Sequence, residues 1–92
     1  MSKRRRKIEG VLDGDTLRLS RKLQGTDKIR LANVDAPEMG SKAGTKARNV
    51  LRGMAGGKTA TIDVVGRSYD RLVANVTVDR KSVNRRMREK GY

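Results

Sequence analysis

The chain has 92 residues, 23 of them Lys or Arg and 10 Asp or Glu, which gives a formal charge of +13 and a pI near 11.1. This length fits one small domain, and the charge predicts a polyanionic partner, nucleic acid before any other, because each cation set against a phosphate releases condensed counterions. The absence of His and Cys excludes thiol catalysis, disulfides, imidazole proton shuttles and Cys-based zinc sites, so any catalysis has to use carboxylates, guanidinium groups and a hard cation.

The N-terminus predicts a basic arm over residues 1–6 and a first strand over residues 7–12. Two compatible interpretations of the arm stay open, a solvated and disordered tail or a direct contact with nucleic acid. The basic start runs into Ile8-Glu9-Gly10 instead of the apolar stretch of a secretory signal, so we expect a cytoplasmic or other intracellular protein. No apolar run approaches the ~20 residues of a transmembrane helix, and we expect a monomer with no membrane partner.

Alternating apolar residues predict a hairpin followed by a third strand. Asp13-Gly14 is a turn-forming pair, and residues 16–21 alternate with period two. Gly25 interrupts this pattern, after which residues 28–34 form the third strand, closed by Pro37. The inward positions of these two strands are Leu17, Leu19, Ile29 and Leu31.

The apolar period changes to that of a helix over residues 43–54. Ser41 or Thr45 is the candidate N-cap, and Gly56-Gly57 ends the helix. The positions that recur at helical spacing are Ala43, Ala47, Val50, Leu51 and Met54.

Two more strands, over residues 58–65 and 72–78, precede a short basic helix over residues 82–90. The inward positions are Ala60, Ile62 and Val64, then either Leu72, Ala74, Val76 and Val78 or Val73 and its neighbours, and finally Val83 and Met87 in the helix. Five strands with a helix between the third and fourth follow the order of an OB-fold, a partly open barrel that commonly binds oligonucleotides. Periodicity alone supports only a small, mainly β, α+β domain.

Four of the acids stand at the two ends of the segment 12–38: Asp13, Asp15, Asp35 and Glu38. Carboxylates favour Ca²⁺, Mg²⁺ or Mn²⁺, and Arg30 adds a planar cation that can hold a phosphate through two parallel hydrogen bonds. Acids, a metal and an arginine together suggest phosphodiester chemistry. For Asp13 an ordinary role stays open, a hydrogen bond within its own turn.

At these residues the sequence resembles the staphylococcal nuclease (thermonuclease) family. The shared motifs are D-G-D-T at 13–16, R-L-x-x-V-D-x-P-E at 30–38 and Y-x-R at 69–71, and the resemblance covers about residues 7–91. It implies an OB-fold endonuclease, a hydrolase that depends on one Ca²⁺ ion and cleaves phosphodiester bonds in DNA, with RNA as a further substrate.

The resemblance also implies roles for the acids. Asp15 and Asp35 become metal ligands, with the backbone carbonyl of Ala36 as a third. Glu38 becomes the carboxylate that positions or deprotonates the attacking water, which needs an acceptor within one hydrogen bond of that water. Without the resemblance, Glu38 reads equally well as an exposed loop acid.

The same resemblance makes Arg30 and Arg71 the catalytic, phosphate-binding arginines and Tyr69 a nucleotide contact. Composition alone would predict that the two arginines are solvated charges on a strand face, and Tyr69 is equally well explained as an aromatic side chain at the barrel edge. Asp70 occupies a position where the family often has glycine, so it could pair with Arg71 and draw that side chain away from the substrate.

Relatives continue past the position of Tyr92, so we expect residues 7–92 to form one nuclease-like domain truncated at its C-terminus. No Phe or Trp is present, so the core has to be aliphatic and the stability modest. The alternative function is a non-catalytic, basic OB-fold module that binds nucleic acid. A structural RNA protein, such as a ribosome-associated one, also fits the charge but leaves the acids unexplained.

Overall fold

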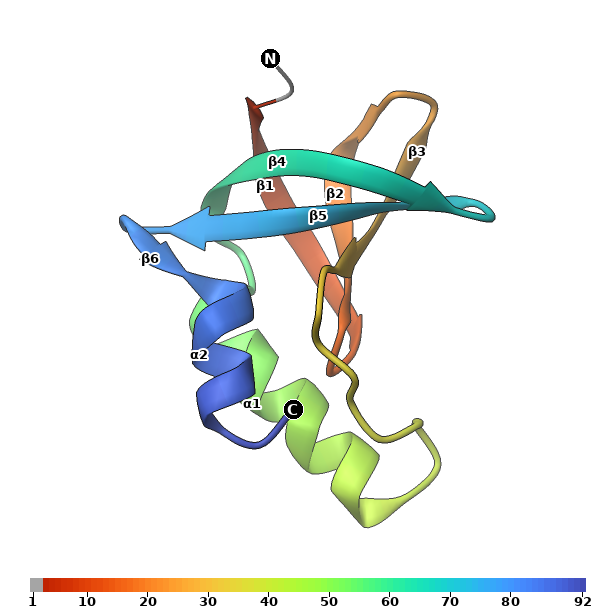
Figure 1. Cartoon of the computed structure of the whole chain (residues 1–92), viewed down its shortest axis with the longest axis vertical. Coiled ribbons are helices and arrows are strands. Elements are labelled where there is room, and N and C mark those ends of the chain that lie inside the picture. Colours follow the sequence, from red (N-terminus) through yellow and green to blue (C-terminus); the bar gives the residue numbers. More distant parts are fainter. Residues whose placement is uncertain (1–2) are drawn as a thin grey trace.

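A computed structural model describes residues 3–92, which fold into six strands and two helices (Figure 1). In chain order these are β1 (Lys3–Asp13), β2 (Thr16–Leu23), β3 (Thr26–Leu31), α1 (Lys42–Ala55), β4 (Thr59–Ser68), β5 (Arg71–Val78), β6 (Lys81–Ser82) and α2 (Val83–Glu89). The predicted helix between the third and fourth strands and the short C-terminal helix are both confirmed. No helix within residues 3–92 is long and apolar enough to cross a bilayer.

The strands form one sheet in the order β3-β2-β1-β4-β5-β6, which closes into a barrel because β3 also pairs with β5. The β3–β5 pairing is parallel, with Ile29 opposite Leu72, and the other strand pairings are antiparallel. Both helices lie together at one end of the barrel (Figure 1). This is the five-stranded OB-fold that the sequence predicted, with β6 as a two-residue addition that periodicity did not indicate.

β1 begins at Lys3, not at Lys7. Residues 3–7 pair antiparallel with residues 59–63 of β4, so the prediction of a disordered tail is wrong for residues 3–6. Met1 and Ser2 of the predicted arm lie outside the described residues. The pairing is possible because main-chain hydrogen bonds do not depend on side-chain charge, and most of these basic side chains stay exposed on the strand.

The core is aliphatic and fills the barrel and the space between the barrel and the helices. Its largest fully buried side chains are Ile8, Leu17, Leu19, Ile29, Leu31, Val34, Leu51, Ile62, Leu72, Val76, Val83 and Met87. On β5 the inward set is therefore the one that begins with Leu72, and Val73 faces outward. In α1 the predicted stripe is buried at Ala47, Leu51 and Met54, but Ala43 is exposed.

Ala43 is exposed because the first turn of α1 presents Gly44 inward instead. The Ser41 hydroxyl accepts a hydrogen bond from the Gly44 N–H (3.0 Å), which confirms Ser41 as the N-cap. A Cβ atom at Gly44 would overlap the carbonyl group of Glu38. The glycine thus lets the start of α1 lie directly against the segment that carries Glu38.

β3 ends at Leu31 instead of the predicted Val34. The chain turns away from the sheet because Asn33 adopts a left-handed conformation (φ 60°), which asparagine tolerates better than most residues. The segment from Ala32 to Ser41 is therefore a long connection lying between the barrel and α1 (Figure 1).

Candidate functional site

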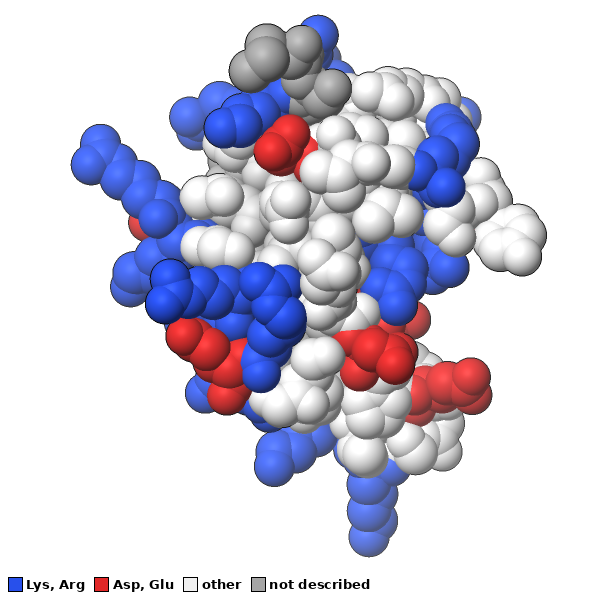
Figure 2. Space-filling view, viewed as in Figure 1, with Lys and Arg blue, Asp and Glu red and all other residues white. Residues whose placement is uncertain are grey.

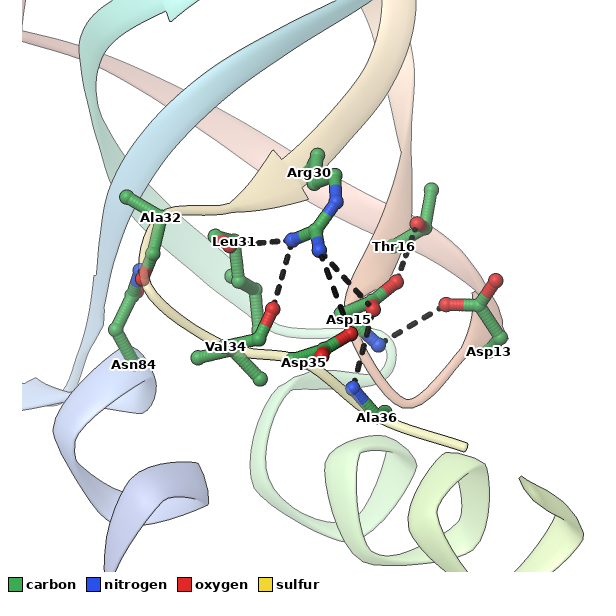
Figure 3. A network of polar contacts seen from close by, with 10 residues as sticks. All are labelled: Asp13, Asp15, Thr16, Arg30, Leu31, Ala32, Val34, Asp35, Ala36 and Asn84. Atoms are coloured by element: carbon green, nitrogen blue, oxygen red, sulfur yellow. Dashed lines mark hydrogen bonds and ion pairs between the residues drawn. The ribbon is translucent and has the colours of Figure 1, made fainter. Parts of the chain in front are cut away.

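Two segments meet at the helical end of the barrel, the β1–β2 turn and the connection that follows β3 (Figure 3). Asp15 joins them through its main chain and its side chain. Its carbonyl accepts from the Leu31 N–H (2.8 Å), and its Oδ2 accepts from the Ala36 N–H (3.2 Å). Pairing of β2 with β3 sets Thr16 opposite Arg30, so the arginine lies beside the same aspartate.

Gly14 makes this approach possible. A Cβ atom at Gly14 would lie 2.5 Å from the Cβ of Ala36 and 2.6 Å from the Cβ of Ala47. The turn, the connection after β3 and helix α1 therefore touch at this one position. Its backbone φ is not in the left-handed region, so close packing, and not turn geometry, requires glycine here.

Arg30 lies at the centre of the site, and the two terminal nitrogens of its guanidinium group have different partners (Figure 3). Nη1 donates to the carbonyls of Leu31 (2.9 Å) and Val34 (2.8 Å). Nη2 lies 3.6 Å from Asp15 Oδ2 and 4.0 Å from Asp35 Oδ1. One edge of the guanidinium thus fixes the connection after β3, while the other faces the two carboxylates.

Asp15 stays ionised in a mostly enclosed position, where its side chain is only 12% exposed. Burial acts to raise the pKa of Asp15, but hydrogen bonding with Asp13, the Ala36 N–H and the Thr16 hydroxyl, together with the Arg30 charge, outweighs it and lowers the pKa. The Thr16 hydroxyl donates to Oδ1 of Asp15 over 3.0 Å. Asp15 is therefore a preformed, negatively charged oxygen donor.

Asp13 has the ordinary role that the sequence left open. Its Oδ1 accepts a hydrogen bond from the Asp15 N–H (3.0 Å) within the turn. Burial raises the pKa of Asp13, and the neighbouring Asp15 raises it further. Asp13 therefore supports the conformation of the turn, and Asp15 supplies the negatively charged carboxylate of the site.

Asp35 projects from the connection with its side chain 97% exposed, and its main chain is held by the Tyr92 carbonyl, which accepts from the Asp35 N–H (2.9 Å). A cavity of ≈ 490 Å³ opens beside it, bounded on one side by Arg30 and Val34 and on the other by Ser68 and Val73. Arg30 and Asp35 thus border one solvent-accessible hollow, which lies over the paired strands β3 and β5.

Glu38 lies farther along the connection and is exposed. Its main-chain carbonyl accepts from the Ser41 hydroxyl (2.9 Å), which fixes the backbone just before α1. Within residues 3–92 its carboxylate makes no hydrogen bond or ion pair, so it does not join the contacts that link Asp15, Asp35 and Arg30. Glu38 therefore lies only three residues after Asp35 in the sequence, but its carboxylate is exposed to solvent.

Arg71 opens β5 on the same outward face as Arg30. Arg30 is opposite Val73 in the parallel β3–β5 pairing, and Arg71 lies two residues before Val73 on the same side of the strand. Its antiparallel partner is Ser68, which lines the cavity. No hydrogen bond or ion pair within residues 3–92 involves the Arg71 side chain, so its guanidinium is not held by another group of the described chain.

Asp70 does not bind Arg71 in the way the sequence suggested. Its carboxylate accepts a hydrogen bond from Lys28 Nζ (3.2 Å), and its carbonyl accepts from the Thr26 hydroxyl (2.6 Å). The hydrogen bond and charge of Lys28 lower the pKa of Asp70, with a smaller effect from Arg71. The preceding Tyr69 is 93% exposed at φ 57°, so it projects from the β4–β5 turn into solvent.

A comparison with models of known protein families shows which family the chain belongs to. Residues 28–92 match the family model described as staphylococcal nuclease homologue. The chain belongs to this family. The matched part includes Arg30, Asp35, Glu38 and Arg71, whereas the turn that carries Asp15 lies before it.

Individual relatives are named as endonucleases. An uncharacterized endonuclease of Haemophilus influenzae is 30% identical over 86 residues, covering 92% of this chain and 48% of the relative. Endonuclease YhcR of Bacillus subtilis is 34% identical over 104 residues, covering 92% of this chain and 8% of the relative. An uncharacterized endonuclease of Escherichia coli O157:H7 is 32% identical over 71 residues, covering 76% and 46%. The chain therefore spans about half the length of two of these relatives.

Membership in the staphylococcal nuclease homologue family implies a divalent cation, and the donor atoms at Asp15 and Asp35 fit one. Both carboxylates face the same cationic atom, Arg30 Nη2, so their oxygens are close enough together to share a neighbour. Within residues 3–92 no three acidic side chains converge on one point, so an ion would depend on two carboxylates, backbone carbonyls and water. Hard cations accept such an oxygen set. Ala36 contacts Asp15 here through its N–H.

Asn84 and Gly14 are site residues that sequence reasoning did not identify. Asn84 is completely buried on α2, and its Nδ2 donates to the carbonyls of Ala32 (2.9 Å) and Ala74 (3.0 Å) while its Oδ1 accepts from the Val76 N–H (2.8 Å). It joins α2 and β5 to the start of the connection that carries Asp35. The available signal was its place beside Val83 on the apolar face of a very basic helix.

Proposed function

We propose that this chain is a Ca²⁺-dependent nuclease that hydrolyses phosphodiester bonds in DNA and also accepts RNA. The observation that supports it is the convergence of Asp15 and Asp35 on Arg30 Nη2 beside the ≈ 490 Å³ cavity. A phosphate entering that cavity meets a guanidinium whose orientation is already fixed, next to two oxygen donors for a cation. A surface adapted only for binding polyanions gains nothing from acids at this position.

Arg30 and Arg71 bind the phosphate in this proposal. Because Nη1 of Arg30 is held by two main-chain carbonyls, Nη2 is positioned before the substrate arrives. Arg71 approaches from the adjacent strand at the rim of the same hollow. Prepositioned guanidinium groups stabilise the extra negative charge that develops on the phosphate oxygens in the transition state more than they stabilise the ground state.

Asp15, Asp35 and the carbonyl of Ala36 are the residues that would hold the Ca²⁺ ion. When bound, such an ion supplies positive charge that neutralises the phosphate and lets an anionic nucleophile approach. The chain contributes the ionised state of Asp15, which is kept by its hydrogen bonds, and a main-chain anchor for Asp35 at Tyr92.

Glu38 accepts the proton of the attacking water. The water oxygen forms a bond to phosphorus, its proton passes to the Glu38 carboxylate, and the bond from phosphorus to the leaving oxygen breaks as that oxygen takes a proton from solvent. The side chain has to turn from solvent toward the cavity for this step. Its backbone is already anchored by Ser41 and by the close approach of Gly44, so rotation about side-chain bonds is the remaining adjustment.

The decisive experiment compares the wild-type chain with Glu38→Gln. Single-stranded and duplex DNA are incubated with each protein and Ca²⁺, with and without chelator. We expect the variant to bind DNA with unchanged affinity and to cleave it at least ~10²-fold more slowly, the effect of losing a positioned general base. Chelation should stop cleavage by the wild type and leave binding intact. Equal cleavage by both proteins would exclude Glu38, and binding without cleavage by either would establish a non-catalytic module.

A further inference from the structure

A row of polar side chains crosses the outer face of the barrel away from Arg30. The strand register places Arg5 of β1 opposite Thr61 of β4, and Thr61 opposite Thr77 of β5. Directly opposed residues of neighbouring strands point to the same face, so these three side chains form one row. No hydrogen bond or ion pair within residues 3–92 uses any of them. The row is a set of unused hydrogen-bond donors on a sheet surface.

The row continues into two adjoining hollows that share Arg80. The first, of ≈ 280 Å³, is lined by Arg5, Thr59, Thr61, Thr77, Asp79 and Arg80. The second, of ≈ 530 Å³, is lined by Arg80, Lys81, Ser82, Arg85, Arg86 and Glu89. Arg80 therefore stands between the two. Figure 2 shows basic side chains gathered over β6 and α2, while acidic ones gather over the connection between β3 and α1.

The acids in these hollows are already engaged by other cations. Asp79 lies 3.9 Å from Lys58 Nζ, and Glu89 Oε2 lies 3.4 Å from Arg85 Nε. Within residues 3–92 the side chains of Arg80 and Arg86 make no ion pair or hydrogen bond. Two guanidinium groups therefore remain uncompensated here, together with that of Arg5.

The backbone conformation at Arg80 indicates that the turn itself does not require an arginine at this position. Asp79 and Arg80 have φ values of 52° and 64°, as both central residues of the β5–β6 turn. The β2–β3 turn has the same pattern, with φ values of 50° at Gln24 and 86° at Gly25. Glycine is the residue that such a turn favours at the second position, and arginine is strained there. The chain has glycine in one turn and arginine in the other.

β5 links this surface to the proposed catalytic cavity. Val73 lines the cavity beside Arg30, and Thr77 lines the first hollow on the same face of the strand. From Val73 to Thr77 the strand advances about 13 Å at ~3.3 Å per residue. In duplex DNA each strand carries one phosphate per about 3.4 Å of helix axis, so this separation corresponds to about four base pairs along a duplex axis and to fewer nucleotides of an extended single strand.

We infer that Arg80, together with Arg5 and Arg86, binds the sugar–phosphate backbone of the same nucleic acid, at least ~13 Å along β5 from the phosphate held at Arg30. This inference rests on the proposed function for its reference phosphate. Guanidinium and hydroxyl donors match phosphate oxygens, and within these two hollows no aromatic or amide side chain is present to read a base. The contact is therefore independent of sequence.

The test measures binding in the presence of chelator, so that no cleavage is needed. Fluorescence anisotropy compares Arg80→Gly with Arg21→Gln, which removes the same charge from an exposed position on β2, using labelled single-stranded DNA of about 12 and about two nucleotides, the second too short to reach both sites. We expect Arg80→Gly to weaken binding of the longer DNA about 3- to 10-fold and to reduce the magnitude of the salt slope by about 0.7. The control should change the affinity less than about twofold, and the shorter DNA should respond less to Arg80→Gly.

Thermal unfolding separates this role from a structural one. Glycine suits φ 64° better than arginine does, so Arg80→Gly should unfold at the same or a higher temperature while its affinity falls. If Arg80→Gly unfolds early, Arg80→Asn, which also tolerates this backbone and removes the charge, replaces it. Equal losses for the Arg80 variant and the Arg21 control would overturn the inference. A wild type that never cleaves DNA, with binding that still depends on Arg80, would overturn only the catalytic proposal.

Discussion

The amide of Asn84 donates to the carbonyl of Ala32 over 2.9 Å and thereby ties α2 to the first residue of the connection that carries Asp35. The same side chain also bonds both main-chain groups it faces on β5. A completely buried amide with three partners holds its neighbours in one arrangement, because an unpaired partner would be costly in this interior. The position of the acidic connection therefore depends on a helix that contains none of the site acids.

Asn84→Ala should destabilise the fold and loosen the site. It leaves the Val76 N–H and the Ala32 carbonyl without their side-chain partner, and each buried unsatisfied group costs about 1–3 kcal/mol. We expect the free energy of unfolding to fall by about 2–4 kcal/mol in urea denaturation. Asn75→Ala, at an exposed position on β5, is the control and should change it by less than about 0.5 kcal/mol. Equal effects of the two substitutions would show that the buried amide contributes no more than a surface one.

Gly14→Ala should separate the two acidic segments. The added methyl group would overlap the Cβ atoms of Ala36 and Ala47, and such overpacking costs about 1–3 kcal/mol. Gly53→Ala is the matched control, because no atom lies within 4 Å of its added Cβ and alanine favours the helix interior. We expect the control to raise the unfolding temperature and Gly14→Ala to lower it. A Gly14→Ala chain as stable as the wild type would mean that the turn moves freely relative to α1.

Sequence periodicity predicted most of the fold because the inward residues of the strands and of α2 are nearly all aliphatic and evenly spaced. Leu17, Leu19, Ile29 and Leu31 are all buried as expected. The basic residues 3–6 were misjudged, since their strand is defined by main-chain pairing with β4 and not by any apolar pattern. Ala43 was misjudged because small residues have little periodic signal, and Gly44 makes the close contact instead.

The candidate site was predicted less completely. The convergence of Asp15 and Arg30 follows from the short hairpin that pairs β2 with β3, so motif and topology agree there. The need for glycine at position 14 arises from contacts with Ala36 and Ala47, which are distant in sequence. The hydrogen bond between Lys28 and Asp70 could not be predicted from the sequence either. Lys28 reaches Asp70 only because β3 pairs with β5 where the barrel closes.

Asp70 should titrate below the usual range for aspartate because Lys28 donates to its carboxylate. A carboxyl group with a lowered pKa in the folded state contributes stability above its unfolded pKa, and this contribution is lost as the pH falls through the folded value. The pKa of Asp70 is measured by NMR titration of its carboxyl carbon, which we expect to move up toward the ordinary value in Lys28→Gln. An unchanged midpoint would show that Lys28 does not hold Asp70 in solution.

Ca²⁺ should stabilise the fold through Asp15 and Asp35 if these residues bind it. A ligand that binds only the native state, at a concentration one hundred times its dissociation constant, adds about 2.7 kcal/mol to the free energy of unfolding. We expect this gain in urea denaturation of the wild type and its loss in Asp35→Asn. Asp79→Asn removes a surface acid paired with Lys58 and should keep the gain. Stabilisation that survives Asp35→Asn would locate the ion elsewhere.

Arg30 and Arg71 should respond differently to replacement by lysine. Lysine keeps the charge but lacks the planar fork, so both variants should lose at least ~10-fold in cleavage rate if the guanidinium groups hold the transition state. Only Arg30→Lys should also lose stability, by about 1–3 kcal/mol, because Nη1 of Arg30 satisfies the carbonyls of Leu31 and Val34. The side chain of Arg71 makes no hydrogen bond or ion pair within residues 3–92, so we expect Arg71→Lys to unfold at the same urea concentration as the wild type. Urea denaturation and cleavage of duplex DNA, measured on the same preparations, separate the two effects. If Arg71→Lys loses stability, or Arg30→Lys does not, the prediction that only Arg30 stabilises the fold would be wrong.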